Sequence, residues 1–197
     1  PTLIDNNILL STRSLKLAAQ GIAVVHNLIG GSLTCVGKGT DNGAPNLPSP
    51  RYTPYHVPHR TEVLGFMTFL HGDVRFYNNL FVQQPVHPAL EKLAQRAKEE
   101  PNAWDDSNVE VGTFPYDGYP TFQEWDKQFE GYCGMGSAPS DRYYSHLPVW
   151  AAGNVYFGGA RPWEQEESPV MVPESVTLRL REEGGRYTLE TDLYRKL

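Results

Sequence analysis

The sequence predicts an all-β fold, a partial solenoid in which short parallel strands stack coil upon coil. The first observation is a phrase, Asn followed by two or three apolar residues, that returns along the chain with a short apolar run before it. The second is the period, because the first two copies lie 20 residues apart, as in folds where each coil buries its face against the next. The third is that these runs are β-prone rather than helical. The four copies are anchored on Asn7, Asn27, Asn79 and Asn154.

An Asn at a fixed turn of each coil has a physical reason. Asn tolerates the left-handed backbone conformation, and its side-chain amide can stack and hydrogen-bond to the Asn one coil away. We therefore expect the four anchors to form one column. The alternative is a β-sandwich in which the four phrases are unrelated turns, but their matched flanking residues favour the solenoid.

The first strands follow from apolar runs. Residues 3–10 are expected to form a strand interrupted at residues 5–7, and residues 21–29 form the next. The continuously apolar run at 22–25 is typical of a parallel sheet covered on both faces or of a filled β-helix interior. A further strand is predicted over 63–70, just before the stretch that carries Asn79.

Residues 37–60 interrupt this pattern. The segment holds five prolines and has no hydrophobic periodicity, so we expect a long loop that leaves the coil. Loops of this length within a compact domain are usually functional or disordered. Its histidines, tyrosines and arginines favour an ordered loop with a function.

Two helices are expected within one insertion at 83–147. Residues 87–100 form the first, with Pro88 in its first turn and Leu90, Leu93, Ala94 and Ala97 on one face. Thr121 and Glu124 form a capping box that opens the second, which ends at Gly131.

The last segment reads as a hairpin. Residues 176–181 alternate strictly between apolar and polar and face residues 186–190 across a Glu-Gly-Gly turn. The sequence thus divides into β-helix coils over 1–172, with insertions at 37–60 and 83–147, and a C-terminal β-hairpin over 173–197 that packs its apolar face on the solenoid.

Composition excludes several classes of function. The net charge is −6 with no basic cluster, which disfavours nucleic acid as a partner. No apolar run is long enough to span a membrane, and we expect no signal peptide. Two cysteines, Cys35 and Cys133, read as free thiols in a reducing compartment, so we expect a cytoplasmic protein. No spacing of Cys and His predicts a metal site, and no cofactor is expected.

The candidate site residues are polar and aromatic. Planar rings and directional hydrogen bonds are what a polyhydroxylated ligand needs. The simpler reading of any one of these residues is a loop residue that caps a strand end, but their concentration favours a sugar site. The candidate substrate-binding residues of the loop and the turn that follows it are Tyr52, Tyr55, His56, His59, Arg60 and His71.

Four phrases carry a resemblance to a known family. They are IDNNILLS at 4–11, QGIAVVHNLIGGS at 20–32, TPYHVPH at 53–59 and LHGDVRFYNNLFV at 70–82. They resemble the later coils of glycoside hydrolase family 120, the β-xylosidases with a right-handed parallel β-helix. The likeness covers nearly all of the chain. It implies a right-handed parallel β-helix and a hydrolase acting on xylo-oligosaccharides.

The resemblance also implies where the catalytic residues lie. In the family an Asp nucleophile and a Glu acid/base occupy two successive coils, and the Glu coil leads into the Asp-Asn-Asn with which this chain begins, so the pair is expected before Pro1. The chain is then a fragment and inactive alone. Both carboxylates stand eleven residues before their anchor, and the equivalent positions here are Lys16 and Thr68. Lys16 would either lower the pKa of the Glu or point along the groove toward a sugar hydroxyl.

The predicted function is part of a retaining exo-glycosidase of β-xylosidase type, with an oligosaccharide substrate and an upstream β-helix segment as partner. Homo-oligomerisation is left open. Two alternatives stand beside this prediction. One is a non-catalytic β-helix module for carbohydrate binding or subunit assembly, and the other is a polysaccharide lyase or polygalacturonase-like enzyme on the same fold.

Overall fold

The computed structural model describes residues 2–17, 19–35, 72–99, 108–131 and 146–197. Most of this part of the chain forms strands in parallel sheets, accompanied by two α-helices. The predicted predominance of parallel strands is confirmed. Within the described ranges no helix combines the length and the apolar character needed to cross a membrane.

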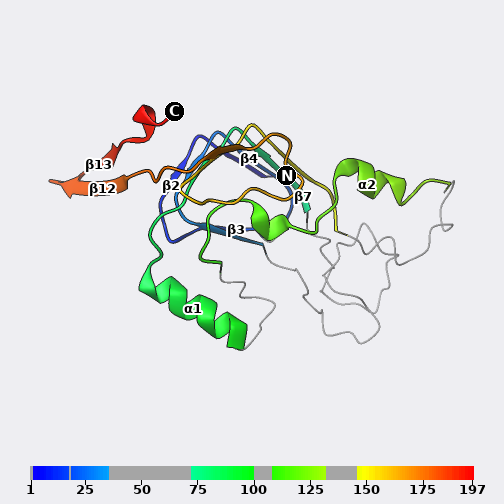
Figure 1. The fold of residues 1–197 in the computed structure, drawn as a ribbon, viewed down its shortest axis with the longest axis horizontal. Helices are drawn as coiled ribbons and strands as arrows, with labels where there is room; N and C mark the ends of the chain where they lie inside the picture. The colour runs from blue at the N-terminus through cyan, green and yellow to red at the C-terminus, as the bar shows by residue number, and fades with distance from the viewer. Residues whose placement is uncertain (1, 18, 36–71, 100–107, 132–145) are drawn as a thin grey trace.

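Three parallel sheets run through the molecule (Figure 1). The first contains, in spatial order, β1 (Thr2–Asp5), β4 (Gln20–Val25), β7 (Gly72–Tyr77) and β9 (Val149–Ala152). The second contains β2 (Ile8–Leu9), β5 (Leu28–Ile29), β8 (Leu80–Val82), β10 (Val155–Phe157) and β11 (Val170–Val172). The third contains β3 (Arg13–Leu17) and β6 (Ser32–Cys35). The chain passes from one sheet to the next and returns, so strands far apart in sequence lie side by side.

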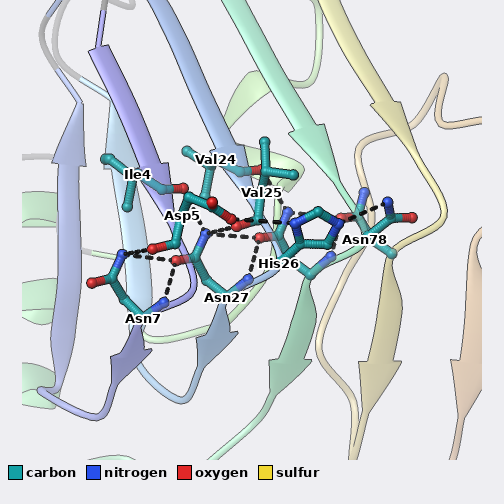
Figure 2. Close-up of polar contacts among 10 residues, drawn as sticks. Ile4, Asp5, Asn7, Val24, Val25, His26, Asn27 and Asn78 are labelled. Atoms are coloured by element: carbon teal, nitrogen blue, oxygen red, sulfur yellow. Dashed lines mark hydrogen bonds and ion pairs between the residues drawn. The ribbon is translucent and has the colours of Figure 1, made fainter.

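The four anchor asparagines form a hydrogen-bonded ladder at the turn between the first and second sheets. Asn7 donates its backbone N–H and its Nδ2 to Oδ1 of Asn27, each at 3.0 Å (Figure 2). The same two bonds join Asn27 to Asn79 and Asn79 to Asn154, at 2.9 to 3.0 Å. The predicted Asn column is therefore confirmed.

The residue before each anchor has the left-handed conformation that this turn requires. Asn6, His26 and Asn78 each have φ of 55°, and Gly153 has φ of 68°. A Cβ added to Gly153 would meet Oδ1 of Asn78 at 2.5 Å. The turn is thus repeated four times, and only its last copy needs glycine.

The ladder ends on a carboxylate. The register of β10 with β11 places Pro169 beside Asn154, where a fifth Asn would stand. Asn154 donates instead to Glu166, with Nδ2 2.8 Å from Oε1, and its backbone N–H bonds to the same carboxyl group. Glu166 is only 8% exposed and supplies the oxygen that Asn side chains supply elsewhere in the ladder.

The interior is filled by alternate residues of the strands. Ile22 and Val24 of β4 stack in register on Val74 and Phe76 of β7, and all four are buried. They belong to one core cluster that also includes Tyr116 and Trp163 from the connecting segments. Burial of this continuous apolar column holds the stacked strands together.

The segment between β8 and β9 carries the helices. These are α1 (Pro88–Glu99), the 3-10 helix η1 (Phe114–Tyr116) and α2 (Phe122–Lys127). The predicted capping box is confirmed, since Thr121 Oγ1 accepts the backbone N–H of Glu124 while the Glu124 carboxylate accepts that of Thr121. In α1 only Leu90 is buried and Leu93 is 46% exposed, so the predicted apolar face is only partly covered.

The predicted C-terminal hairpin is confirmed as an antiparallel pair. It consists of β12 (Leu178–Glu183) and β13 (Arg186–Thr191) and is followed by the 3-10 helix η3 (Leu193–Arg195). Figure 1 shows the pair extending away from the stacked strands. Val176 is buried in a second core cluster at its base, whereas Leu180 is 55% exposed. The apolar face of the hairpin is therefore covered only near its base.

Several predicted elements lie outside the described residues, among them the strand at 63–70, the loop at 37–60, and Cys133. Cys35 is buried and forms no disulfide, as predicted, and its thiol donates to the carbonyl of Pro115 at 3.3 Å. The third sheet was not predicted, because its strands β3 and β6 lack an anchor residue of their own.

Candidate functional site

Seven of the eight predicted substrate-binding residues fall outside the described residues. They are Tyr52, Tyr55, His56, His59, Arg60, Thr68 and His71. Their placement in the site stays a prediction. The eighth, Lys16, is described.

Lys16 lies on the outer side of β3 and is exposed. In the pairing of β3 with β6 its neighbour on the next strand is Thr34, which is buried and donates its hydroxyl to the carbonyl of Leu15 at 3.5 Å. A fixed spacing before Asn79 predicts Thr68 in this column. In the described register it is Thr34 that stands beside Lys16.

The spacing before the anchor fails because Thr34 lies 45 residues before Asn79, whereas Lys16 lies 11 before Asn27. The spacing after the anchor also differs between the two strands, because β3 contains a β-bulge. The register shifts between Arg13 and Leu15, so Ser14 is an extra residue in β3. Arg13, the first residue of β3, is six residues after Asn7, whereas Ser32, the first of β6, is five after Asn27. As a result, the number of residues between Asn7 and Lys16 exceeds the number between Asn27 and Thr34 by two.

A polar and aromatic cluster lies on the outer face of the first sheet, on β7 and β9. Arg75 pairs in register with Trp150, and its guanidinium carbon lies 4.2 Å from the centre of the indole ring. Arg75 also forms an ion pair with Asp73, with Nη1 2.6 Å from Oδ1. The two charged side chains are 40% and 36% exposed. We call Asp73, Arg75 and Trp150 the arginine–tryptophan cluster.

Helix α2 extends this cluster with further aromatic rings. Phe122 stacks on Trp150 with ring centres 6.3 Å apart, and Trp125 contacts both Phe122 and Phe129. The capping box that starts α2 fixes the direction in which Phe122 leaves the turn. Phe122 is 45% exposed and presents apolar surface beside a charged pair.

The backbone at the start of β7 is constrained. Gly72 has φ of 111°, and a Cβ there would approach the carbonyl oxygen of Leu147 at 2.1 Å. Asp73 itself has φ of 51°, a conformation that costs energy for a residue with a side chain. Its N–H donates to the carbonyl of Pro148 at 2.7 Å. This strained backbone places the Asp73 carboxylate next to Arg75.

The sequence carries a signal for the arginine–tryptophan cluster that none of the predictions used. Arg75 and Trp150 each stand four residues before an anchor Asn. The same offset before Asn27 and Asn7 gives Ala23 and Leu3, which continue the same row of the sheet. Comparing the residues that stand four positions before each anchor Asn would have identified this cluster from the sequence.

The buried carboxyl group of Glu166 has a raised pKa, but its hydrogen bonds indicate a structural role. Burial raises the pKa, while hydrogen bonds from Tyr156 and Asn154 oppose that shift. Burial and the adjacent carboxyl also raise the pKa of the Tyr156 hydroxyl, which bonds both Glu166 and Thr113. A shifted pKa often marks a catalytic group, but here the carboxyl group terminates the Asn ladder and has little contact with solvent.

A groove of about 360 Å³ lies at the opposite end of β3 and β6 from Lys16. Its lining includes Thr12, just before β3, and Ser32, the first residue of β6, together with Gln84, His87 and Leu178. Its volume is within the range of small-molecule pockets. Lys16 does not line it.

No catalytic carboxylate pair is evident within the described ranges. Several carboxylates there bind structural groups: Asp73 pairs with Arg75, Glu110 with Arg161, and Glu124 with its own helix start. The same ranges contain no group of three or more potential metal ligands.

Comparison with known proteins gives a structural match. No family model and no curated protein matches the sequence. Among solved structures, the complex of XylC with xylose is similar, with a TM-score of 0.60 and 28% sequence identity. The match covers 95% of this chain and 24% of the XylC chain. This chain therefore resembles about a quarter of a larger protein that was solved with a bound sugar.

Proposed function

We propose that this chain is part of a retaining exo-glycosidase of the β-xylosidase type that hydrolyses xylo-oligosaccharides. The observation that carries the proposal is the match to XylC, solved with xylose, over 95% of the chain. The phrases that resemble glycoside hydrolase family 120 support the same reading. The corresponding architecture is a right-handed parallel β-helix, supported by the three parallel sheets and the Asn ladder.

The catalytic Asp and Glu belong, in this proposal, to coils that precede β1. Within the described residues β1, β2 and β3 are each the outermost strand at the same end of their sheets. Each other ladder oxygen accepts two bonds, but no described donor reaches Oδ1 of Asn7. Another coil carrying an Asn would supply those two donors and pair with all three strands.

Strand spacing supports the retaining mechanism. Neighbouring strands are about 4.8 Å apart, so carboxylates in one column of adjacent coils would stand about 5 Å apart. That separation is expected for a nucleophile and an acid/base that work through a covalent glycosyl-enzyme. Lys16 would continue this column on the near side, where its charge could reach a sugar hydroxyl.

The remaining predicted residues would bound the sugar pocket. His56, His59 and Arg60 contact substrate hydroxyls in this proposal, supported from the next turn by His71. The arginine–tryptophan cluster would extend the binding surface where the chain enters β7. A cytoplasmic location, proposed from the two thiols, fits an enzyme that acts on short oligosaccharides.

The proposal is tested by measuring release of nitrophenol from an aryl β-xyloside. The purified 197-residue chain should show no activity above background, and a longer protein that includes the preceding coils should be active. The control is an aryl glucoside, which should be a poorer substrate of the longer protein. Activity of the isolated chain would show that its own residues supply the acid and nucleophile and would refute the proposed division.

A second candidate function is a non-catalytic carbohydrate-binding module. It is favoured by the arginine–tryptophan cluster and by the neighbouring exposed ring of Phe122. Calorimetric titration of the isolated chain with xylobiose distinguishes the two functions. Binding that is lost in Trp150→Ala, together with an inactive longer protein, would favour the module.

A further inference from the structure

The C-terminal hairpin is built in a way that the proposed glycosidase activity does not require. Its strands β12 and β13 form a separate two-stranded sheet that projects from the stacked strands (Figure 1). Only its base joins a core cluster, through Val176, Leu178 and Leu193. A lone two-stranded hairpin is marginally stable in water, so an added strand or a covering surface would stabilise this one.

One face of the hairpin is largely apolar, with Glu182 and Thr191 as its polar members. Leu180 lies directly opposite Leu189, and Tyr187 and Leu178 are on the same face because side chains alternate along each strand. Leu180 is 55% exposed and Tyr187 is 64% exposed. The apolar face is therefore open to a partner in the described part of the structure.

The outer edge of β13 is complementary to itself. The strand reads Arg186, Tyr187, Thr188, Leu189, Glu190, Thr191, and the described sheet pairs it only with β12. A second β13 placed antiparallel, with the two-fold axis at Thr188, brings Arg186 opposite Glu190 of the other copy. It also brings Tyr187 opposite Leu189. Opposite charges and aromatic–aliphatic pairs directly across an antiparallel ladder are stabilising.

The other edge is less complementary. For β12, an axis at Leu180 sets Arg179 against Arg181. An axis at Arg181 sets Arg179 against Glu183 but also Leu180 against Glu182. The first arrangement opposes like charges, and the second combines one favourable charge pair with a carboxylate beside a leucine. The more self-complementary strand is therefore β13.

We propose that two copies of this chain associate through β13, forming a four-stranded antiparallel sheet in the order β12, β13, β13, β12. The two pairs of Arg186 and Glu190 fix the register on one face. On the other face, the leucines and tyrosines of both hairpins form one continuous apolar surface. Such an isologous contact closes on itself and gives a dimer.

The test uses the full 197-residue chain in analytical ultracentrifugation. The unchanged chain should form dimers. Arg186→Glu and Glu190→Arg each oppose like charges at both pairs and should weaken dimerisation about tenfold or more. An equimolar mixture of the two variants should regain dimers, because an acidic position 186 in one copy then faces a basic position 190 in the other. Lys98→Glu, on exposed α1, is the control of matched charge change and should leave dimerisation unchanged.

Two results would overturn the proposal. A chain that stays monomeric throughout the concentration range has no such interface. Dimers that persist equally in both single variants use another surface, such as the open strands β1 to β3 or the hairpin's apolar face alone. Circular dichroism of each variant verifies that its strand content is intact, which matters at position 190 because Glu190 also pairs with Arg181 of its own hairpin, with Nε 2.9 Å from Oε1. The double variant R186E/E190R restores opposite charges between the copies and should dimerise more tightly than either single variant.

Discussion

Two regions of the molecule repeat their geometry to different degrees: the turn that carries the Asn ladder, and the third sheet. At the turn between the first and second sheets, the four Asn residues make the same bonds each time, with a left-handed residue before each. In the third sheet, β3 carries an extra residue. The contrast shows that a hydrogen-bonded column fixes the local geometry of its turn, although the anchors are 20, 52 and 75 residues apart, whereas β3, which lies outside the column, accommodates a bulge.

The largest effect is expected at the middle of the ladder. Asn79→Leu removes the acceptor of two bonds from Asn27 and leaves its buried backbone N–H unpaired, whereas its Nδ2 keeps the carbonyls of Ile4 and Val25. We expect a loss of about 2–5 kcal/mol in the free energy of unfolding, measured by urea denaturation. The control is Asn7→Leu at the exposed end of the ladder, which should cost less than about 1 kcal/mol. Equal losses at both positions would show that the bonds between asparagines do not stabilise the stack.

Gly153 should be the next most sensitive position. Gly153→Ala must place a side chain in the left-handed conformation and against Oδ1 of Asn78, so we expect a loss of about 1–3 kcal/mol. At the equivalent place in the preceding turn, Asn78→Gly serves as the control and should lie within about 1 kcal/mol of the unchanged chain. A fully stable Gly153→Ala variant would mean that the turn is not constrained as described.

The end of the ladder should respond to pH. Burial raises the pKa of Glu166, so the folded chain holds this proton more tightly than the unfolded chain. The contribution of Glu166 to stability is then greatest below the ordinary pKa of a glutamate and is lost as pH rises through the raised value. Glu166→Gln keeps an oxygen for Asn154 and cannot ionise. Its free energy of unfolding relative to the unchanged chain should therefore increase across that pH window, and Glu166→Ala is the control that removes the acceptor at every pH.

The smallest effect on stability is expected at Lys16. Its side chain is exposed on β3, so Lys16→Ala should change the free energy of unfolding by less than about 0.5 kcal/mol. In the longer active protein the same change should lower kcat/KM for an aryl xyloside, because the lost cation no longer reaches the sugar. Unchanged kcat/KM would remove Lys16 from the site, and a large loss of stability would make it a structural residue.

The parts of the fold that could be predicted are those in which one residue type is required. An Asn at a buried anchor supplies both the donor and the acceptor of the ladder, and a capping box needs Thr121 and Glu124 at fixed spacing. Glu166 could not be predicted, because it reaches the ladder from an irregular segment and takes the place that Pro169 cannot fill. The exposure of Leu180 was missed because alternation along a strand shows that one face is apolar but not what covers it.

The candidate site was less predictable for a related reason. A constant offset from the anchors correctly relates Arg75 to Trp150 within the regular sheet, but it fails between Lys16 and Thr34, where Ser14 shifts the register. The position of a surface residue depends on where strands contain extra residues. The anchor asparagines do not reveal those extra residues in the sequence. The loop residues from Tyr52 to His71 stay predictions because they lie outside the described residues.

We propose that this chain forms one side of a glycosidase groove whose nucleophile lies on a preceding coil. The decisive measurement is labelling of the longer active protein with a 2-deoxy-2-fluoro-xyloside, which traps the covalent glycosyl-enzyme, followed by peptide mapping by mass spectrometry. We expect the label on an Asp in the part that precedes residues 1–197. A label on a carboxylate within this chain, such as Asp73, would contradict that placement.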